Sequence, residues 1–160
     1  MPVDYPLLKK QFEGLAEADD DPLALSANFV ALLYSEMPDI NWLGIYVARG
    51  NELVLGPFQG LPACVRIPLG QGVCGTAAEK AATLRVDNVH DFDGHIACDP
   101  ASNSELVVPL VAEHGLVGVL DIDSPITARF SAADQAGIES LCATFVERLA
   151  CRPAGSGGFI

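Results

Sequence analysis

Two strongly apolar segments, SELVVPLVA (104–112) and LVGVLDID (116–123), stand on either side of the short polar stretch EHG. Runs of this length and valine content, bounded by turn residues, are typical of buried β-strands. Their close spacing predicts an antiparallel hairpin. Pro109 has no backbone N–H to donate to a neighbouring strand, so we expect it at an edge or a bulge.

The register of this hairpin decides which side chains share a face. Because side chains alternate along a strand, the second segment divides into a face with two aspartates and a wholly apolar face: Val117, Val119, Asp121 and Asp123 against Leu116, Leu120 and Ile122. A three-residue loop, 113–115, would pair Ala112 with Leu116 and place Glu105 opposite Asp123. A two-residue loop would turn Glu105 to the other face, and the sequence allows both.

Shorter elements are predicted around the hairpin. Helices are expected over about 4–18, from Pro22 with Asp21 as its cap, over 72–82, and from Ser131 with Asp134 completing a capping box. Strands are expected over 41–48, 52–58, 64–70 and 83–89, followed by a loop over 90–103. The apolar residues expected on the buried helix faces are Leu7, Leu8, Phe12, Leu15, Leu25, Phe29, Leu32, Leu33, Ile138, Leu141, Phe145 and Leu149.

The order of these elements predicts an α+β fold. We expect one domain over 1–151, in which an antiparallel sheet carries helices on one face and a ligand pocket under loops on the other. Residues 152–160 are expected to form a flexible C-terminal tail.

Charge and cysteine content exclude several classes of function. Nine Lys and Arg against 21 Asp and Glu give a net charge of −12, which disfavours binding to nucleic acid or to anionic membranes. The chain has no apolar run long enough to span a bilayer and no secretory signal at its N-terminus, so we expect a cytoplasmic protein. An odd count of 5 cysteines then favours free, redox-active thiols over a disulfide framework.

The cysteines differ in their surroundings. Cys98 lies in the long polar loop, where a thiol is accessible, but the adjacent aspartates do not favour a low thiol pKa. Cys64 begins a predicted strand, and Cys74 lies at a helix start, where the helix dipole could favour a thiolate; plain packing of Cys74 is the alternative. Cys142 is expected in the core and Cys151 near the tail. A zinc site made of Cys64, Cys74, Cys98, His90 and His95 lacks the paired spacing of structural zinc sites.

Three carboxylates form the second group of candidate residues. If Glu105, Asp121 and Asp123 converge, their mutual repulsion raises their pKa values, so that one could hold a proton near neutral pH and act as an acid. Together they could also bind a cation such as a substrate ammonium group. The alternative is a solvent-facing strand end followed by an Asp-Ser turn.

The chain contains, in this order, the segments INWLGIYV, LVLGPFQG, ACVRIPLGQGVCGTA, VDNVHDFDGHIACDPASNSELVVPL and GVLDIDSP. Together they resemble the free methionine-(R)-sulfoxide reductases, a catalytic branch of the GAF-domain family. The similarity extends from about Tyr5 to Ala150. It implies a GAF-like fold, free methionine-R-sulfoxide as substrate, thioredoxin as reductant and a homodimer, with no metal or organic cofactor.

The resemblance also assigns roles to the matching residues. It implies that Cys98 is the catalytic cysteine and Cys64 the resolving one, with Cys74 able to join the disulfide chemistry. It places Glu105, Asp121 and Asp123 in the active site, with Trp42 beside the substrate methyl group and Tyr46 nearby. Two alternatives are a GAF sensor that binds a small ligand without catalysis and a thiol redox sensor without turnover.

Overall fold

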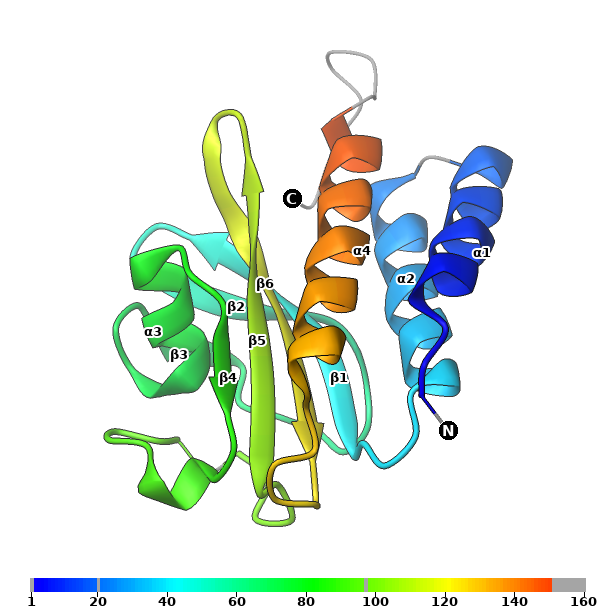
Figure 1. The fold of residues 1–160 in the computed structure, drawn as a ribbon. Helices are drawn as coiled ribbons and strands as arrows, with labels where there is room; N and C mark the ends of the chain where they lie inside the picture. Colours follow the sequence, from blue (N-terminus) through cyan, green and yellow to red (C-terminus); the bar gives the residue numbers. More distant parts are fainter. Residues whose placement is uncertain (1, 20, 97, 151–160) are drawn as a thin grey trace.

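The predicted hairpin forms two of the inner strands of a six-stranded antiparallel sheet, whose strand order is β3-β2-β1-β6-β5-β4 (Figure 1). The computed structural model describes residues 2–19, 21–96 and 98–150. Its elements are α1 (Tyr5–Ala18), α2 (Pro22–Glu36), β1 (Trp42–Arg49), β2 (Glu52–Gln59), β3 (Arg66–Pro68), α3 (Gly72–Lys80), β4 (Leu84–Val86), the 3₁₀ turn η1 (Val89–Asp91), β5 (Ser104–Ala112), β6 (Gly115–Ser124) and α4 (Ala132–Ala150). The predicted α+β architecture is confirmed, and the proposed tail lies outside the described residues.

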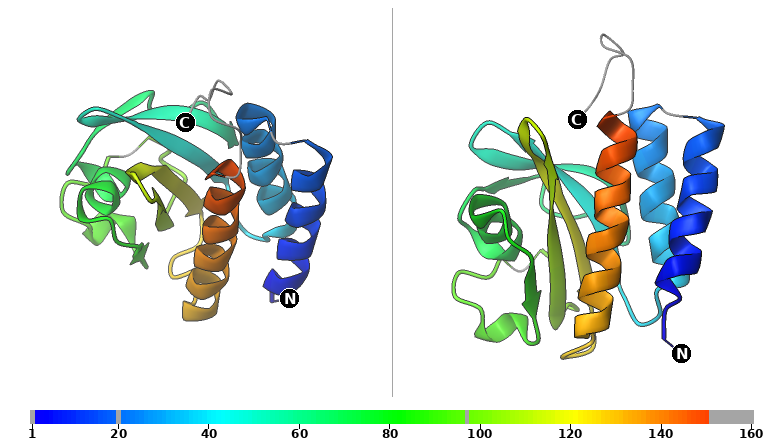
Figure 2. Two further views of the ribbon diagram at one scale, coloured as in Figure 1. Left: turned by 90° about the horizontal axis from the view of Figure 1, so that it is seen from above. Right: turned by 45° about the horizontal axis from the view of Figure 1, so that its top comes forward.

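The helices cover both faces of the sheet unequally. α1, α2 and α4 lie side by side on one face, whereas α3 packs alone on the other (Figure 2). The sequence predicted helices on one face only. This prediction is wrong in one respect, because the pocket face carries α3 in addition to loops. Gly75 permits this placement, because any side chain there would overlap the backbone carbonyl of Pro68. In the described part of the chain no helix has the length and apolarity that a membrane crossing requires.

The larger core lies between the sheet and the three-helix layer. Phe12, Phe29 and Phe145 meet at its centre, with the rings of Phe29 and Phe145 stacked 4.5 Å apart. Leu7 and Leu15, which were expected to be buried, are 50% and 38% exposed. Their positions flank the narrow stripe of α1 that contacts α2 and α4, and this stripe is formed by Leu8, Phe12 and Ala16.

The predicted helix caps are present. The Asp21 side chain accepts a hydrogen bond from the backbone N–H of Ala24 at the start of α2. Before α4, the N–H of Ser131 donates to Asp134 Oδ2, and the N–H of Asp134 donates to Ser131 Oγ. This reciprocal pair satisfies backbone donors that a helix start leaves free.

A β-bulge sets the register of the central hairpin. Ala112 pairs with Gly115, so the loop contains two residues rather than three. The register shifts between Leu110, which pairs with Gly118, and Val111, which pairs with Leu116, leaving Val117 as the extra residue of β6. This extra residue offsets the shorter loop, so that Glu105 still lies opposite Asp123.

The bulge also corrects the predicted faces of β6. Leu116 packs on the α3 side of the sheet, and Val117 packs into the larger core on the other side, which is the reverse of the simple alternation. Beyond the bulge the alternation is as predicted, with Val119 on the α3 side and Leu120 in the larger core. Pro109 lies past the part of β5 that pairs with β4, where its missing N–H is tolerated.

Gly118 next to the bulge is expected to be indispensable for packing. A side chain at this position would overlap the backbone carbonyl of Tyr46 on β1. We expect Gly118→Ala to lower the free energy of unfolding by about 1–3 kcal/mol, because a paired backbone cannot move aside. Urea denaturation checks this.

Gly14→Ala is the matched control, because Gly14 lies in α1 and no atom outside its own helix turn lies within 4 Å of the place that an added methyl group would take. Replacing a helical glycine with alanine should raise stability by about 0.5–1 kcal/mol. A Gly118→Ala protein as stable as the parent would contradict the close approach of β1 and β6.

Candidate active site

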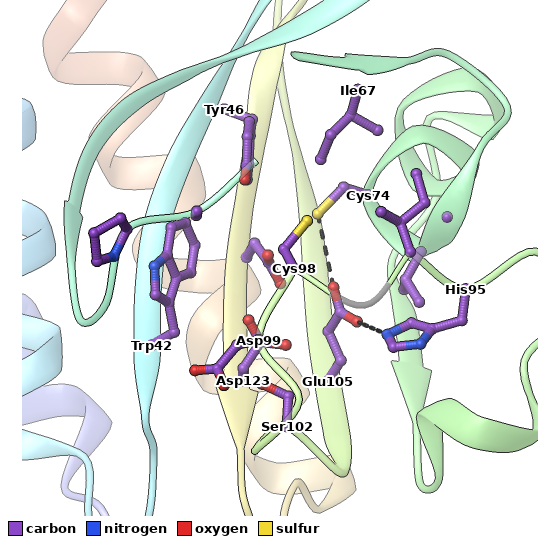
Figure 3. Close-up of a pocket in the computed structure, with 16 residues that line it drawn as sticks. Trp42, Tyr46, Ile67, Cys74, His95, Cys98, Asp99, Ser102, Glu105 and Asp123 are labelled. Atoms are coloured by element: carbon purple, nitrogen blue, oxygen red, sulfur yellow. Dashed lines mark hydrogen bonds and ion pairs between the residues drawn. The ribbon is translucent and has the colours of Figure 1, made fainter. Parts of the chain in front are cut away.

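A small cavity of about 40 Å³ lies between the sheet and α3 (Figure 3). Seven of the eight residues singled out from the sequence line it: Trp42, Tyr46, Cys74, Cys98, Glu105, Asp121 and Asp123. The eighth, Cys64, is bonded to Cys98. The carboxylates and the cysteines therefore belong to one site, and the alternative of a solvent-facing strand end is wrong.

A disulfide joins Cys64 and Cys98, whose Cα atoms lie 5.6 Å apart. This separation is normal for a disulfide, so the backbone of this fold brings the two cysteines within bonding reach. Cys64 precedes β3 instead of beginning it, because β3 starts at Arg66. Cys142 is a free thiol buried in the larger core, as predicted, and Cys151 lies outside the described residues.

The three carboxylates converge because of the β5–β6 register. Glu105 on β5 pairs with Asp123 on β6, and residues directly opposite each other in a sheet share a face. Asp121 lies two positions before Asp123 on β6 and is therefore on the same face, so all three side chains reach the pocket. Glu105 and Asp121 are only 5% and 6% exposed, and Asp123 is half-buried. Glu105 Oε2 lies 4.0 Å from Nε2 of His95.

Burial shifts the proton affinity of all three groups. Loss of hydration, together with the negative charge of Asp121, raises the pKa values of Glu105 and Asp123 well above their usual range. Burial also raises the pKa of Asp121, to about 6, while hydrogen bonds from Glu105 and Cys74 work in the opposite direction. All three pKa values are therefore raised, and the site holds protons at neutral pH.

Cys74 does not have the environment predicted for it. Its thiol lies on α3 and donates a hydrogen bond to Glu105 Oε1 at 3.7 Å. Burial, followed by the charges of Asp121 and Glu105, raises the pKa of this thiol well above its usual range. Of the two alternatives given for Cys74, burial agrees with plain packing, and a thiolate is not favoured because desolvation and two carboxylates outweigh the helix dipole.

Two aromatic residues of β1 hold the segment that carries Cys64. Trp42 and Tyr46 lie on the same face of the strand, with ring centroids 5.8 Å apart. The Trp42 indole N–H donates to the carbonyl of Leu61 at 3.0 Å, and the Tyr46 hydroxyl donates to the carbonyl of Cys64 at 2.9 Å. These residues therefore do more than line the cavity, since they fix the backbone on one side of the disulfide.

A second set of contacts holds the Cys98 side, and sequence reasoning missed it. The Asn41 amide donates to Asp99 Oδ2 at 3.0 Å and to Ser102 Oγ at 3.2 Å. Asp99 in turn accepts a hydrogen bond from the N–H of Ala101. The partners are 58 and 61 residues apart in sequence, so no local pattern could have indicated them. His95 was considered only as a metal ligand, although it lies beside Glu105.

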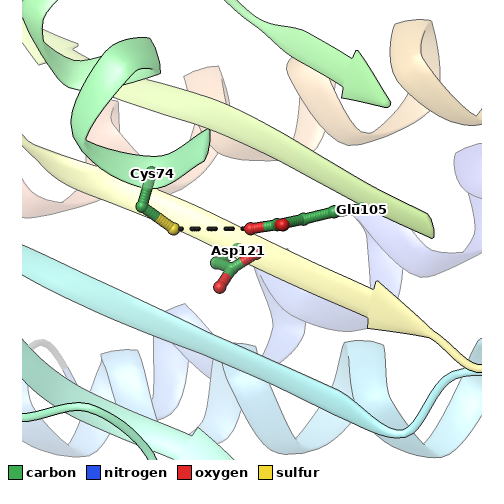
Figure 4. Close-up of side chains that lie close together, drawn as sticks. All are labelled: Cys74, Glu105 and Asp121. Atoms are coloured by element: carbon green, nitrogen blue, oxygen red, sulfur yellow. Dashed lines mark hydrogen bonds between the residues drawn. The ribbon is translucent and has the colours of Figure 1, made fainter. Parts of the chain in front are cut away.

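One group of side chains could hold a cation. The Cys74 sulfur and one oxygen each of Glu105 and Asp121 all lie within 4.8 Å of one another (Figure 4). This set differs from the zinc site considered from the sequence, in which Cys64 and Cys98 would have been ligands. In the present structure those two sulfurs are bonded to each other.

The chain resembles proteins of known family along most of its length. The family model for the GAF domain matches residues 21–149. A free methionine-R-sulfoxide reductase of Escherichia coli is 51% identical over 146 residues, which cover 91% of this chain and 88% of that protein. The solved structure of an fRMsr of Staphylococcus aureus in complex with substrate has a TM-score of 0.88 and 48% identity, covering 93% of this chain and 97% of that one.

A third relative is more distant in sequence. The structure of a free methionine-R-sulfoxide reductase from Neisseria meningitidis, in complex with its substrate, is 38% identical with a TM-score of 0.88. The match covers 91% of this chain and 88% of that chain.

The buried carboxylates predict that stability falls as pH rises. Asp121 has a pKa of about 6 in the folded chain, against an ordinary value of 3.8. Its contribution is therefore fully present below about pH 4 and is lost as the pH rises through about 6. We expect Asp121 alone to make the free energy of unfolding about 1 kcal/mol higher at about pH 5 than at about pH 7.5. The raised pKa values of Glu105 and Asp123 add to this difference with the same sign, and urea denaturation at the two pH values measures the total.

The pH dependence of the free energy of unfolding is expected to weaken in Asp121→Asn, because asparagine cannot ionise. Glu17→Gln is the matched control, because Glu17 is exposed on α1 and the change in net charge is the same. An Asp121→Asn protein with the full pH dependence would show that another group is responsible.

Proposed function

The chain belongs to the GAF-domain family, within its branch of free methionine-R-sulfoxide reductases, and from this premise we propose that it reduces free L-methionine-(R)-sulfoxide to L-methionine. The observation that carries the proposal is the Cys64–Cys98 pair beside three buried carboxylates in one cavity. A sensor that binds a small ligand requires neither a pair of cysteines in bonding distance nor a set of protonated acids.

The first step joins a soft nucleophile with an acid. The Cys98 thiolate attacks the sulfoxide sulfur, and a carboxylic acid of the site donates a proton to the oxygen. The oxygen is transferred to Cys98, which becomes a sulfenic acid, and methionine is released with two more electrons on its sulfur. Cys98 is thereby oxidised and the substrate reduced.

The carboxylates divide two tasks among them. The raised pKa values of Glu105 and Asp123 suit either of them to protonate the oxygen. An ionised carboxylate of the same group is suited to bind the substrate ammonium group. This requirement for a cation favours the free amino acid over a residue within a peptide, where that nitrogen is an amide.

The second step converts the sulfenic acid into a disulfide, and a later exchange returns the thiols. The Cys64 thiol attacks the Cys98 sulfenic acid, which forms the disulfide and releases water. Cys74 is the weaker candidate for this role, because its thiol is buried, hydrogen-bonded to Glu105 and has a raised pKa. An external dithiol of the thioredoxin class then reduces the disulfide by exchange.

The disulfide also affects reactivity. It occupies the sulfur of Cys98, the proposed nucleophile, so this form cannot attack a sulfoxide. We therefore infer that the disulfide must be reduced before each turnover. Thioredoxin as the natural reductant, the homodimer and the cytoplasmic location stay predictions.

An enzyme assay tests the activity directly. Free methionine-R-sulfoxide is incubated with the protein, thioredoxin, thioredoxin reductase and NADPH, and NADPH consumption is followed. Cys98→Ser should abolish turnover, and Cys64→Ser should yield at most one methionine per site with this reductant. Cys151→Ser serves as the control and should retain full turnover. NADPH consumption equal to that without the protein would reject the enzyme in favour of a sensor.

Tyr46 is expected to matter in the second step more than in the first. Tyr46→Phe keeps the ring but removes the hydroxyl that holds the Cys64 carbonyl. We expect disulfide formation to slow by about tenfold, corresponding to one lost hydrogen bond, whereas methionine release in a single turnover is retained. Trapping of the sulfenic acid with dimedone measures its lifetime. Tyr34→Phe on α2 is the control, and equal slowing of both steps would contradict a positioning role.

A further inference from the structure

We propose that the cavity also binds a transition-metal dication, preferentially Zn²⁺, between Cys74, Glu105 and Asp121, and that the bound ion inhibits the enzyme. The binding stands on the geometry of these residues alone. The inhibition rests on the proposed function, because it assumes that the same carboxylates serve the substrate.

The three ligand atoms are nearly in place for a tetrahedral ion. They lie within 4.8 Å of one another, and the distance from Cys74 Sγ to Glu105 Oε1 is 3.7 Å. Tetrahedral zinc with ordinary bond lengths places its ligand atoms about 3.5 Å apart, so small side-chain adjustments suffice. The ligands come from α3, β5 and β6, which pack against one another.

An unsatisfied oxygen gives an independent reason to expect a ligand here. Asp121 is 6% exposed, and its Oδ1 is buried without a hydrogen-bond partner. Buried polar atoms without partners are rare, because each loses its hydration without compensation. A metal ion bound by the Asp121 carboxylate would compensate this group for its lost hydration, and its double positive charge would offset the crowded acids.

The ligand types select the metal. One sulfur with carboxylate oxygens suits Zn²⁺ or Co²⁺, whereas Ca²⁺ and Mg²⁺ prefer oxygen ligands alone and more of them. His95 is placed to support the site, since its Nε2 lies 4.0 Å from Glu105 Oε2. Coordination replaces the Cys74 S–H bond by an S–Zn bond and releases this proton to solvent, together with any proton that Glu105 and Asp121 carry, with no change of oxidation state.

In the disulfide form, the redox cysteines cannot take part in metal binding at this site. Cys64 and Cys98 are bonded to each other, whereas Cys74 remains a free thiol. The cavity of about 40 Å³ accommodates an ion. Metal binding can therefore be measured in oxidised protein without added substrate, where neither redox cysteine can be a ligand.

The experiment is a Co²⁺ titration of the oxidised full chain, without reductant, in a Cys151→Ser background. Cys74 and the deeply buried Cys142 are then the free thiols. We expect a near-ultraviolet thiolate-to-cobalt absorption band that saturates at one ion per chain and disappears when Zn²⁺ is added. Cys74→Ser should abolish the band. Asp121→Asn should weaken Zn²⁺ affinity, measured by calorimetry, by about tenfold or more. Cys142→Ala is the control and should retain both.

Inhibition is tested separately in pre-reduced, desalted protein, as methionine formed per site in a single turnover with and without Zn²⁺. We expect Zn²⁺ to suppress the product in the parent and much less in Cys74→Ser. Absence of the cobalt band in oxidised protein, or a band that survives Cys74→Ser, would overturn the site; equal inhibition of parent and variant would overturn the inhibitory role. Absence of methionine even without Zn²⁺ would reject the proposed function and leave the cobalt result standing.

Discussion

The pairing of Glu105 with Asp123 is the constraint on which the site depends. It comes from two compensating irregularities, a two-residue loop and one extra residue at Val117. Without the extra residue in β6, the shorter loop would shift the pairing by one position and turn Glu105 into the larger core. With it, Glu105 and Asp121 face the cavity, while Leu120 and Ile122 pack under the helices on the other face.

Burial of these three carboxylates lowers the stability of the fold and raises their proton affinity. Each carboxylate loses hydration on folding, and the molecule meets that cost by keeping protons on the group. The same protons are what a sulfoxide oxygen requires. The burial that makes the site costly to fold therefore also raises its proton affinity, which is the property that the proposed reaction needs from an acid.

Two sets of hydrogen bonds hold the cysteines against this acidic group. Trp42 and Tyr46 fix the backbone before and at Cys64, and Asn41 fixes the loop just after Cys98. Trp42 and Tyr46 lie in β1 and Asn41 directly precedes it, and the pairing of β1 with β6 places them relative to Asp121 and Asp123. The loops that carry the cysteines are irregular, while hydrogen bonds from this edge of β1 hold them.

The sequence by itself determined the order of the main elements, the helix caps, the fold class and the cysteines, acids and aromatic residues that meet in the cavity, because these follow from local periodicity and from long motifs. It did not indicate Asn41, Asp99 or Ser102, whose contacts join distant segments. It did not determine the hairpin register, the face on which α3 packs or the raised pKa of Cys74. The bulge at Val117, the contact of Gly75 with the β3 segment and the burial of Cys74 against Glu105 decided those. Each depends on the packing of segments far apart in the chain, and local preferences carry no information about such contacts.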